Sequence, residues 1–315
     1  MADKSTLSYL AQLLDSHIAP IEASIRLLNI CPDDKQAISQ LIKNLRLGCT
    51  LAESVNQAEF TSQLEHEILK VAELSGKTSE ALRFISSNII KRQKRSHDLR
   101  MRLILPNAII FIMLAIYTIR AMTAGSGIGS ILISSIPVLT LSISITYLLI
   151  SLVRHDASYW ISFGWRLGLQ TSSNKFRSLS DHFFFTLFYW QQDAGIDYIS
   201  GAKILNKLFN ASAFQQSMSN YLANINKGKT VTDALSDAHL LAAGELQQVI
   251  KTGENSGRLA HALKHFLKAN QLHIDQSTDI ALMWIPRIYY LITMIIGVKI
   301  YCSLHIFTQN TIITA

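Results

Sequence analysis

The sequence has few cysteines and little sign of β-structure. Its three cysteines, Cys31, Cys49 and Cys302, show no pairing pattern among 315 residues, so we expect no disulfide. Strand-like alternation of apolar and polar residues is nearly absent, which argues against a sheet. The N-terminus has no apolar signal core with a small-residue cleavage site, which predicts that the chain is not secreted. Together these absences favour a helical protein that is not secreted.

Signatures of chemistry are also missing. No serine or cysteine has a recognisable nucleophile setting. Gly228-Lys229-Thr230 resembles the end of a phosphate-binding loop, but Ala223 stands where that loop needs another glycine, so a helix cap is favoured. His261 and His265 lie four residues apart, yet Ala262 replaces the acid of the zinc-protease motif, which favours surface or interface histidines. We therefore expect a non-enzymatic protein with no catalytic residue, cofactor or metal, and no nucleic-acid partner.

Long apolar segments, in contrast, are present. Three of them, at 103–122, 131–153 and 284–307, reach the roughly 20 residues that a helix needs to cross a bilayer. Backbone groups inside a bilayer must satisfy their own hydrogen bonds, so each segment is expected to be a helix. The rest of the chain is polar enough to be soluble, in two blocks of about a hundred residues or more, and each can form a small core.

Basic residues beside the spans predict the orientation. Six precede the first span and two follow the second: Lys91, Arg92, Lys94, Arg95, Arg100 and Arg102, then Arg154 and Arg166. The connection at 123–130 carries no charge. The positive-inside rule therefore places both soluble blocks, and the N-terminus, in the cytoplasm, and the hairpin connection and the C-terminal tail outside. Much of the net charge of +7 is then juxtamembrane, where it meets anionic lipid headgroups.

Apolar spacing within the two blocks is helical. In the first block it predicts helices near 5–16, 20–30, 34–47, 51–57, 63–75 and 78–101, the last continuing into the first span. In the second block it predicts helices near 179–194, 197–208, 212–226, 231–237, 243–255 and 258–280. The expected fold class is all-α, with two homologous cytoplasmic six-helix bundles and three transmembrane helices. The expected domains are a first bundle, a membrane hairpin, a second bundle, a last span and a short outer tail: 1–102, 103–153, 154–283, 284–307 and 308–315.

Residues 183–190 are mostly aromatic, and in a helix their aromatic side chains lie on all sides. Such a helix is expected to be buried in a bundle core or against the membrane interface.

The two blocks repeat the same signals for helix ends. In each block a glycine stop is followed two residues later by a threonine N-cap, which itself precedes an acid by three residues: Gly48, Thr50 and Glu53, then Gly228, Thr230 and Asp233. Ser62 and Glu65 predict a capping box at the start of the fifth helix.

A second repeated signal closes the fifth helix of each block. It consists of Glu73, Ser75, Gly76 and Leu82 in the first block, and of Gly253, Glu254, Ser256, Gly257, Leu259 and Leu263 in the second. Gly76 and Gly257 lie where the helix should stop in a left-handed conformation. Each glutamate lies at the unfavourable end of the helix dipole, which predicts a stabilising partner. The N–H groups that open the sixth helix are the nearest candidates, with Lys77 and Arg258 as alternatives; a surface recognised by another protein also stays open.

This motif, Gly-Glu-x-Ser-Gly-x-Leu with a further leucine and then a span, resembles the type II secretion system F family. The second copy matches it fully, whereas the first has Ala72 and Thr78 in place of a glycine and a leucine. The resemblance covers nearly the whole chain, in span order as well as in motif. It implies a polytopic platform protein of the bacterial inner membrane that serves type II secretion or type IV pilus assembly, with the type IVb pilus systems as one subgroup.

The resemblance also implies partners. Family members oligomerise in the membrane, have no catalytic activity, and are thought to couple a cytoplasmic hexameric ATPase to the extraction and polymerisation of pilin or pseudopilin, beside other inner-membrane assembly proteins. The alternative classes are a small transporter or channel subunit and a membrane-anchored sensor. Three spans are few for a transporter, and the repeat lies in the soluble blocks rather than in inverted membrane halves.

Two basic residues fall inside the third span. Arg287 lies near its cytoplasmic end and can extend to the headgroups. Lys299 lies deeper, where a lysine costs roughly 3 kcal/mol on insertion scales. Either Lys299 extends outward to the headgroups, or it pairs with an acidic residue of a pilin-like transmembrane helix or of a neighbouring subunit.

Overall fold

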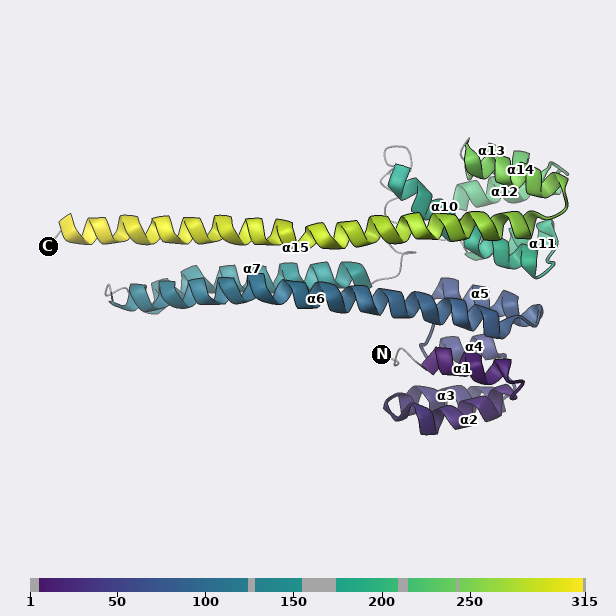
Figure 1. Cartoon of the computed structure of the whole chain (residues 1–315), viewed down its shortest axis with the longest axis horizontal. Helices are drawn as coiled ribbons and strands as arrows, with labels where there is room; N and C mark the ends of the chain where they lie inside the picture. Colours follow the sequence, from purple (N-terminus) through teal and green to yellow (C-terminus); the bar gives the residue numbers. More distant parts are fainter. Residues whose placement is uncertain (1–5, 124–127, 155–173, 209–214, 242–243, 314–315) are drawn as a thin grey trace. The chain divides into compact units, whose positions relative to one another are not determined.

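The chain is helical throughout the part that the structure, a computed structural model, describes (Figure 1). The described residues are 6–123, 128–154, 174–208, 215–241 and 244–313. They form 13 α-helices and one short 3-10 helix, and they contain no β-strand. The all-α prediction is confirmed.

The helices fall close to the ranges that the apolar spacing predicts. In the first block they are α1 (Thr6–Asp15), α2 (Pro20–Ile30), the 3-10 helix η1 (Pro32–Asp34), α3 (Lys35–Arg46), α4 (Leu51–Gln57), α5 (Gln63–Leu74) and α6 (Thr78–Thr123). Next comes α7 (Ile128–Arg154). In the second block they are α10 (Asn174–Asp193), α11 (Tyr198–Leu208), α12 (Gln215–Asn226), α13 (Val231–Asp237), α14 (Glu245–Asn255) and α15 (Leu259–Ile313).

Two helices are much longer than the others: α6 has 46 residues and α15 has 55 residues. As predicted, α6 continues from the sixth helix of the first block into the first apolar segment. In the second block we expected a sixth helix that ends near 280 and a separate span, but α15 runs through both. Pro286 lies inside α15. A proline removes only one backbone hydrogen bond of the helix. The neighbouring residues of an apolar segment still favour a helix, because it satisfies their backbone hydrogen bonds internally.

The second to fifth helices of the two blocks match in order and closely in length. Helices α2 and α11 both have 11 residues, α3 and α12 both have 12, and α4 and α13 both have 7. Helix α5 has 12 residues and α14 has 11.

The turns between these helices match as well. Left-handed residues occupy four corresponding turns in each block, at His17, Gly48, Glu59 and Gly76, and at Gly195, Gly228, His239 and Gly257. After the last of them, the Lys77 N–H donates to the Ala72 carbonyl (2.8 Å) and the Arg258 N–H donates to the Gly253 carbonyl (2.9 Å). These are the bonds that close a helix with a left-handed residue after its last turn. The blocks therefore share turn geometry as well as helix lengths.

The chain divides into two compact units. One combines Met1–Ile90 with Asp156–Asp275, and the other combines Lys91–His155 with Gln276–Ala315. The first unit holds both helical blocks, and a single cluster of buried apolar side chains runs through the two of them. We call the contact between the blocks the seam.

Helix α10 contributes the largest side chains to this shared core. Phe184, Phe185, Phe188 and Trp190 are all buried, although they point to different sides of the helix. The Trp190 ring also lies beside Phe84 of α6, with ring centroids 6.1 Å apart. The prediction that this aromatic helix is buried is confirmed, and the reason for its composition is that it packs against both blocks.

Within the described part of the chain, α6 is the helix found to be long and apolar enough to cross a membrane. A shorter apolar stretch, Ser135–Ser151, lies in α7. The third predicted span is helical backbone within α15, and the side chain of Lys299 lies outside the described residues. Three spans per chain therefore stay a prediction.

Two leucines of the first block provide a matched test of this core. Leu82 in α6 is fully buried, whereas Leu74 at the end of α5 is 75% exposed. Leu82→Ala leaves a cavity and should lower the free energy of unfolding by about 2–5 kcal/mol, while Leu74→Ala should change it by less than about 0.5 kcal/mol. Urea unfolding of the full chain in detergent, followed by circular dichroism, measures both; equal effects would contradict the core described above.

Candidate functional site

The motif glutamate of the first block caps another helix. Glu73 lies in the last turn of α5, and its carboxylate accepts hydrogen bonds from the backbone N–H groups of Leu51 (2.8 Å) and Ala52 (3.0 Å). These two residues open α4. The first N–H groups of a helix have no partner within the helix, so the Glu73 carboxylate supplies one to each of two such groups.

The second block repeats this arrangement. The Glu254 carboxylate accepts from the N–H groups of Val231 (2.6 Å) and Thr232 (3.0 Å), which open α13. It also accepts from the Thr232 hydroxyl (2.7 Å). We refer to these two arrangements together as the carboxylate clamps.

The prediction of which helix start binds the two glutamates was wrong. Each does have a stabilising partner, but this partner is the start of the fourth helix of its block and not the start of the sixth. The reason is that α4 packs beside α5, so that the side chain of Glu73 reaches sideways to it. A carboxylate opposes the dipole of its own helix at the C-terminal end but favours the positive N-terminal end of the neighbouring helix. This explains why an acid can be stable at the end of α5.

A threonine completes each clamp. The Thr50 hydroxyl accepts from the Glu53 N–H (3.2 Å), and the Thr230 hydroxyl accepts from the Asp233 N–H (3.1 Å). The first three N–H groups of α4 and of α13 are therefore all bonded. Both helices have only 7 residues, and isolated helices shorter than about 12 residues are marginal in water. Capping by the clamp and packing thus hold these helices in place. The predicted threonine caps are confirmed, as is the capping box, in which the Ser62 N–H donates to Glu65 (2.9 Å).

The remaining motif residues shape the turn after the glutamate. Gly76 and Gly257 have φ of 71° and 66°, the left-handed conformation that glycine adopts without strain. The hydroxyl of Ser75 donates to the Ala72 carbonyl (3.0 Å), and that of Ser256 donates to the Gly253 carbonyl (3.2 Å). The motif leucines Leu82, Leu259 and Leu263 are buried.

Gly253 is required by close packing. A Cβ atom at this position would lie 3.0 Å from the Leu259 Cα and 3.1 Å from the Ala262 Cβ. The first block has Ala72 at the corresponding place, where it is fully buried. The start of α15 thus lies closer to the preceding helix than an alanine at 253 would allow without adjustment.

The pKa values around the second clamp are shifted mainly by burial, and also by the charge of the half-buried Glu254. Burial, and then the negative charge of Glu254, raise the pKa of the Tyr198 phenol. Burial also raises the pKa of Tyr221. Asp197 accepts from the Ser200 N–H (2.9 Å), and this bond lowers the pKa of the Asp197 carboxyl. A pocket of about 300 Å³ has Glu254, Tyr198 and Lys229 among its lining residues. Both Glu254 oxygens are taken up by the helix start, so the arrangement positions helices and offers no free base.

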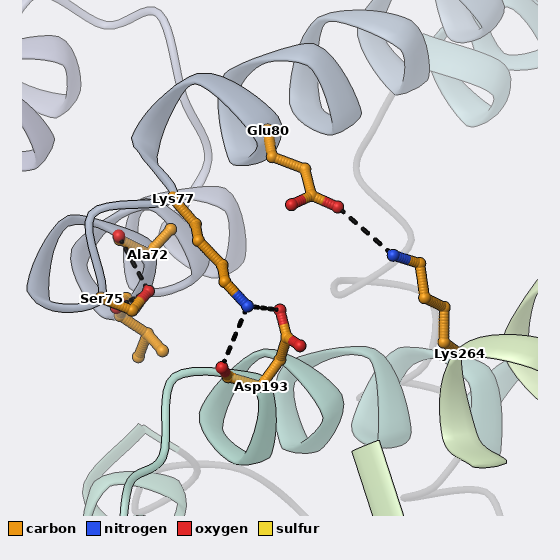
Figure 2. A network of polar contacts seen from close by, with 7 residues as sticks. Ala72, Ser75, Lys77, Glu80, Asp193 and Lys264 are labelled. Atoms are coloured by element: carbon orange, nitrogen blue, oxygen red, sulfur yellow. Dashed lines mark hydrogen bonds and ion pairs between the residues drawn. The ribbon is translucent and has the colours of Figure 1, made fainter. Parts of the chain in front are cut away.

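The residue after the motif glycine links the two blocks. The Lys77 ammonium lies 2.6 Å from the Asp193 carboxylate and also donates to the Asp193 backbone carbonyl at 3.2 Å, as Figure 2 shows. A second, longer pair joins Lys264 to Glu80 (3.5 Å) across the same seam (Figure 2). Lys77, an alternative partner predicted for Glu73, therefore serves the seam instead.

The second unit, Lys91–His155 with Gln276–Ala315, is rich in apolar helix and is called the apolar unit below; it has a polar cluster of its own. The Asn107 amide of α6 donates to the Thr146 hydroxyl (3.1 Å), and the Asn107 carbonyl oxygen accepts from the Ser142 (2.7 Å) and Tyr289 (2.9 Å) hydroxyls. Ser142 and Thr146 belong to α7, and Tyr289 belongs to α15. Hydrogen bonds between apolar helices hold them in one register, because a polar group left unpaired among apolar side chains is costly. We call this group the polar knot; sequence reasoning missed it, although polar residues inside predicted spans were a possible signal.

The other predicted site residues have different surroundings. The Arg287 guanidinium lies over the Trp284 ring, 5.2 Å from its centroid. The rings of His261 and His265 are 4.6 Å apart on α15. In the described part of the chain, no group of three or more histidines, cysteines and acids is arranged to hold a metal.

Residues 6–121 match the family described as type II secretion system (T2SS), protein F. This confirms the resemblance to the type II secretion system F family for the first block and most of α6. Proteins of this family are membrane platform proteins of secretion and pilus machinery rather than enzymes. A comparison with curated proteins found no match.

Removing either clamp carboxylate should loosen the short helix that it holds. Glu73→Ala breaks two hydrogen bonds to a charged acceptor and Glu254→Ala breaks three, and we expect each to lower the free energy of unfolding by about 1.5–3 kcal/mol. Amide hydrogen exchange should rise at 51–57 in the first variant and at 231–237 in the second.

Glu67→Ala is the matched control, because Glu67 lies on the same helix as Glu73 and makes no polar contact among the described residues. Its exchange and stability should stay close to those of the parent chain. If Glu73→Ala leaves exchange at 51–57 unchanged, the clamp does not hold α4.

Proposed function

We propose that this chain, whose residues 6–121 carry a T2SS protein F domain, is a polytopic platform protein of a type II secretion or type IV pilus machine, type IVb systems included. In this role it couples a cytoplasmic assembly ATPase to the extraction and polymerisation of pilin or pseudopilin. One observation carries the proposal: the carboxylate clamp, in a domain of this family, recurs with the same geometry at Glu254 in the second half of the chain.

The proposed architecture is an internal duplication. Matching lengths of the second to fifth helices, four matching left-handed turns and two clamps with the same pair of backbone hydrogen bonds support it. The domains would be a first bundle (1–102), a hairpin of two spans (103–153), a second bundle (154–283), a third span (284–307) and an outer tail (308–315). Basic residues at the start of the first span and an uncharged connection at 123–130 favour both bundles in the cytoplasm and the C-terminus in the periplasm.

The structure suggests how the parts could work together. The two blocks share a core and a seam, so a partner that binds one block acts on both. Helices α6 and α15 each begin two residues after a motif glycine and continue into an apolar segment without a break in the helix. An ATPase that contacts the cytoplasmic blocks would thus act on the same helices that meet pilin in the membrane. No step of this coupling requires a catalytic residue of the chain itself.

The proposed partners are the hexameric ATPase, pilin or pseudopilin, other inner-membrane assembly proteins, membrane lipid and further copies of the chain. Cross-linking in membranes separates this proposal from a transporter, a channel or a sensor. A platform protein should cross-link to the ATPase from exposed positions in its soluble blocks and to pilin from its apolar helices. Recovery of neither partner under conditions in which the machine assembles would count against the platform role.

Cysteine labelling should place both blocks on the same side of the membrane. Lys70 and Lys251 are exposed and occupy corresponding places four residues before the ends of α5 and α14. A membrane-impermeant maleimide should label Lys70→Cys and Lys251→Cys in inverted vesicles but not in spheroplasts. Ser126→Cys, in the predicted outer connection, should show the reverse. Opposite accessibility of Lys70→Cys and Lys251→Cys would contradict the proposed topology.

Lys299 should be essential if it pairs with an acidic residue of a pilin-like helix or a neighbouring subunit. Lys299→Leu should then abolish pilus or pseudopilus assembly, because an acid in the bilayer would lose its partner charge. Lys299→Arg keeps the charge and should retain assembly. Counting assembled fibres, with immunoblots to confirm equal membrane levels, measures both; normal assembly by Lys299→Leu would favour simple extension to the headgroups.

A further inference from the structure

The apolar unit carries a groove on the side of α6. The groove has a volume of about 330 Å³ and follows one stripe of the helix from Arg100 through Leu103, Asn107 and Ala108 to Phe111, with Thr146 of α7 beside it. Residues three and four apart on a helix share a face, so these side chains form a continuous trough along the helix axis.

The floor of this groove offers no free polar group. The Asn107 amide donates to the Thr146 hydroxyl (3.1 Å) and to the Leu103 carbonyl (2.8 Å). The Asn107 carbonyl oxygen is bonded within the polar knot. The hydrogen-bonding capacity of these groups is met by the protein and, apart from Arg100, the other lining side chains are apolar. The occupant of the trough should therefore be a hydrocarbon chain and not a polar molecule.

The mouth of the groove is positively charged. Arg100 is exposed at one end of the trough, and it has no hydrogen bond or ion pair within the described residues. No acidic residue is among the described residues that line the groove. A cation at the end of an apolar trough complements an amphiphile that has an anionic head and an apolar tail.

We propose that this groove binds an anionic phospholipid, with the phosphate at Arg100 and an acyl chain along α6 as far as Phe111. Arg100 and Phe111 are eleven residues apart, a rise of about 16 Å in an α-helix. Half of a hydrocarbon core about 30 Å thick is about 15 Å, so the trough has the depth of one leaflet. The inference rests on the proposed membrane insertion of α6.

Lipid retention by the full-length chain tests the site. The protein is delipidated in neutral detergent, given equal amounts of phosphatidylglycerol and phosphatidylcholine, purified again, and analysed by mass spectrometry for the ratio of the two retained lipids. We expect a clear excess of phosphatidylglycerol. Arg100→Gln should reduce that ratio about fivefold, the effect of one interfacial cation on an anionic headgroup. Arg102→Gln removes the same charge from an exposed position outside the groove and should leave the ratio nearly unchanged.

A second pair of variants tests the trough itself. Ala108→Leu fills the groove and should lower the total amount of both retained lipids. Ala115→Leu adds the same bulk at an exposed position seven residues along α6, outside the lining, and should not. Should Ala108→Leu fail to fold, the two arginine variants still decide the question.

Three results would overturn the inference. One is an equal loss in Arg100→Gln and Arg102→Gln, which indicates diffuse attraction to a charged surface. Another is unchanged retention in Ala108→Leu. The third is displacement of phosphatidylglycerol by inorganic phosphate, which indicates a site for a free anion. Labelling at Lys70, Ser126 and Lys251 tests the membrane topology separately, so a failure of the lipid site is distinguishable from a failure of the proposed function.

Discussion

The rest of the first unit, which holds both helical blocks, depends on a carboxylate at the end of one helix that binds the start of another. Glu73 and Glu254 each bridge the fifth and fourth helices of their block. The helix that they hold is too short to persist alone, and the turn that follows each glutamate starts a long helix with an apolar segment. A single side chain thus fixes the angle between two elements at the point where each block leads into α6 or α15. Both clamps use the same physical principle, in which an acid is placed at the positive end of a neighbouring helix dipole.

The seam shows how two similar blocks become different from each other. Asp15 and Asp193 each end the first helix of their block, and Arg83 and Lys264 are each the sixth residue of the long helix. In the first block the acid and the base of this set pair with each other, since Arg83 binds Asp15. In the second block the acid and the base both bind residues of the first block: Asp193 binds Lys77, and Lys264 binds Glu80. Exposed ion pairs contribute little to stability, so we attribute the strength of the seam mainly to the buried aromatic side chains of α10 and assign orientation to the charges.

Sequence patterns predict the parts of this structure that depend on neighbouring residues. The caps at Thr50 and Thr230 and the glycine stop at Gly76 involve groups within a few positions of each other, and they are found as expected. The partner of Glu73 is 22 positions away, and Asp193 is 116 positions from Lys77. Asn107 and Tyr289 in the polar knot are separated by 182 positions. Helical periodicity places each of these residues on a face, but it carries no information about which other face lies opposite, and for that reason the clamps were misassigned and the seam and the knot were missed.

The shared core also sets an order of events during synthesis. All six helices of the first block are synthesised before α10. The surface of the first block at the seam is covered only when α10 is made, because Trp190 of α10 lies beside Phe84. About a hundred residues separate these two positions, and at roughly 5–20 residues per second their synthesis takes on the order of 5–20 seconds. During this interval the nascent chain presents the apolar surface that α10 covers in the finished fold. Helix α10 precedes the other described helices of the second block, so the residues that cover this surface are made before the second block is complete.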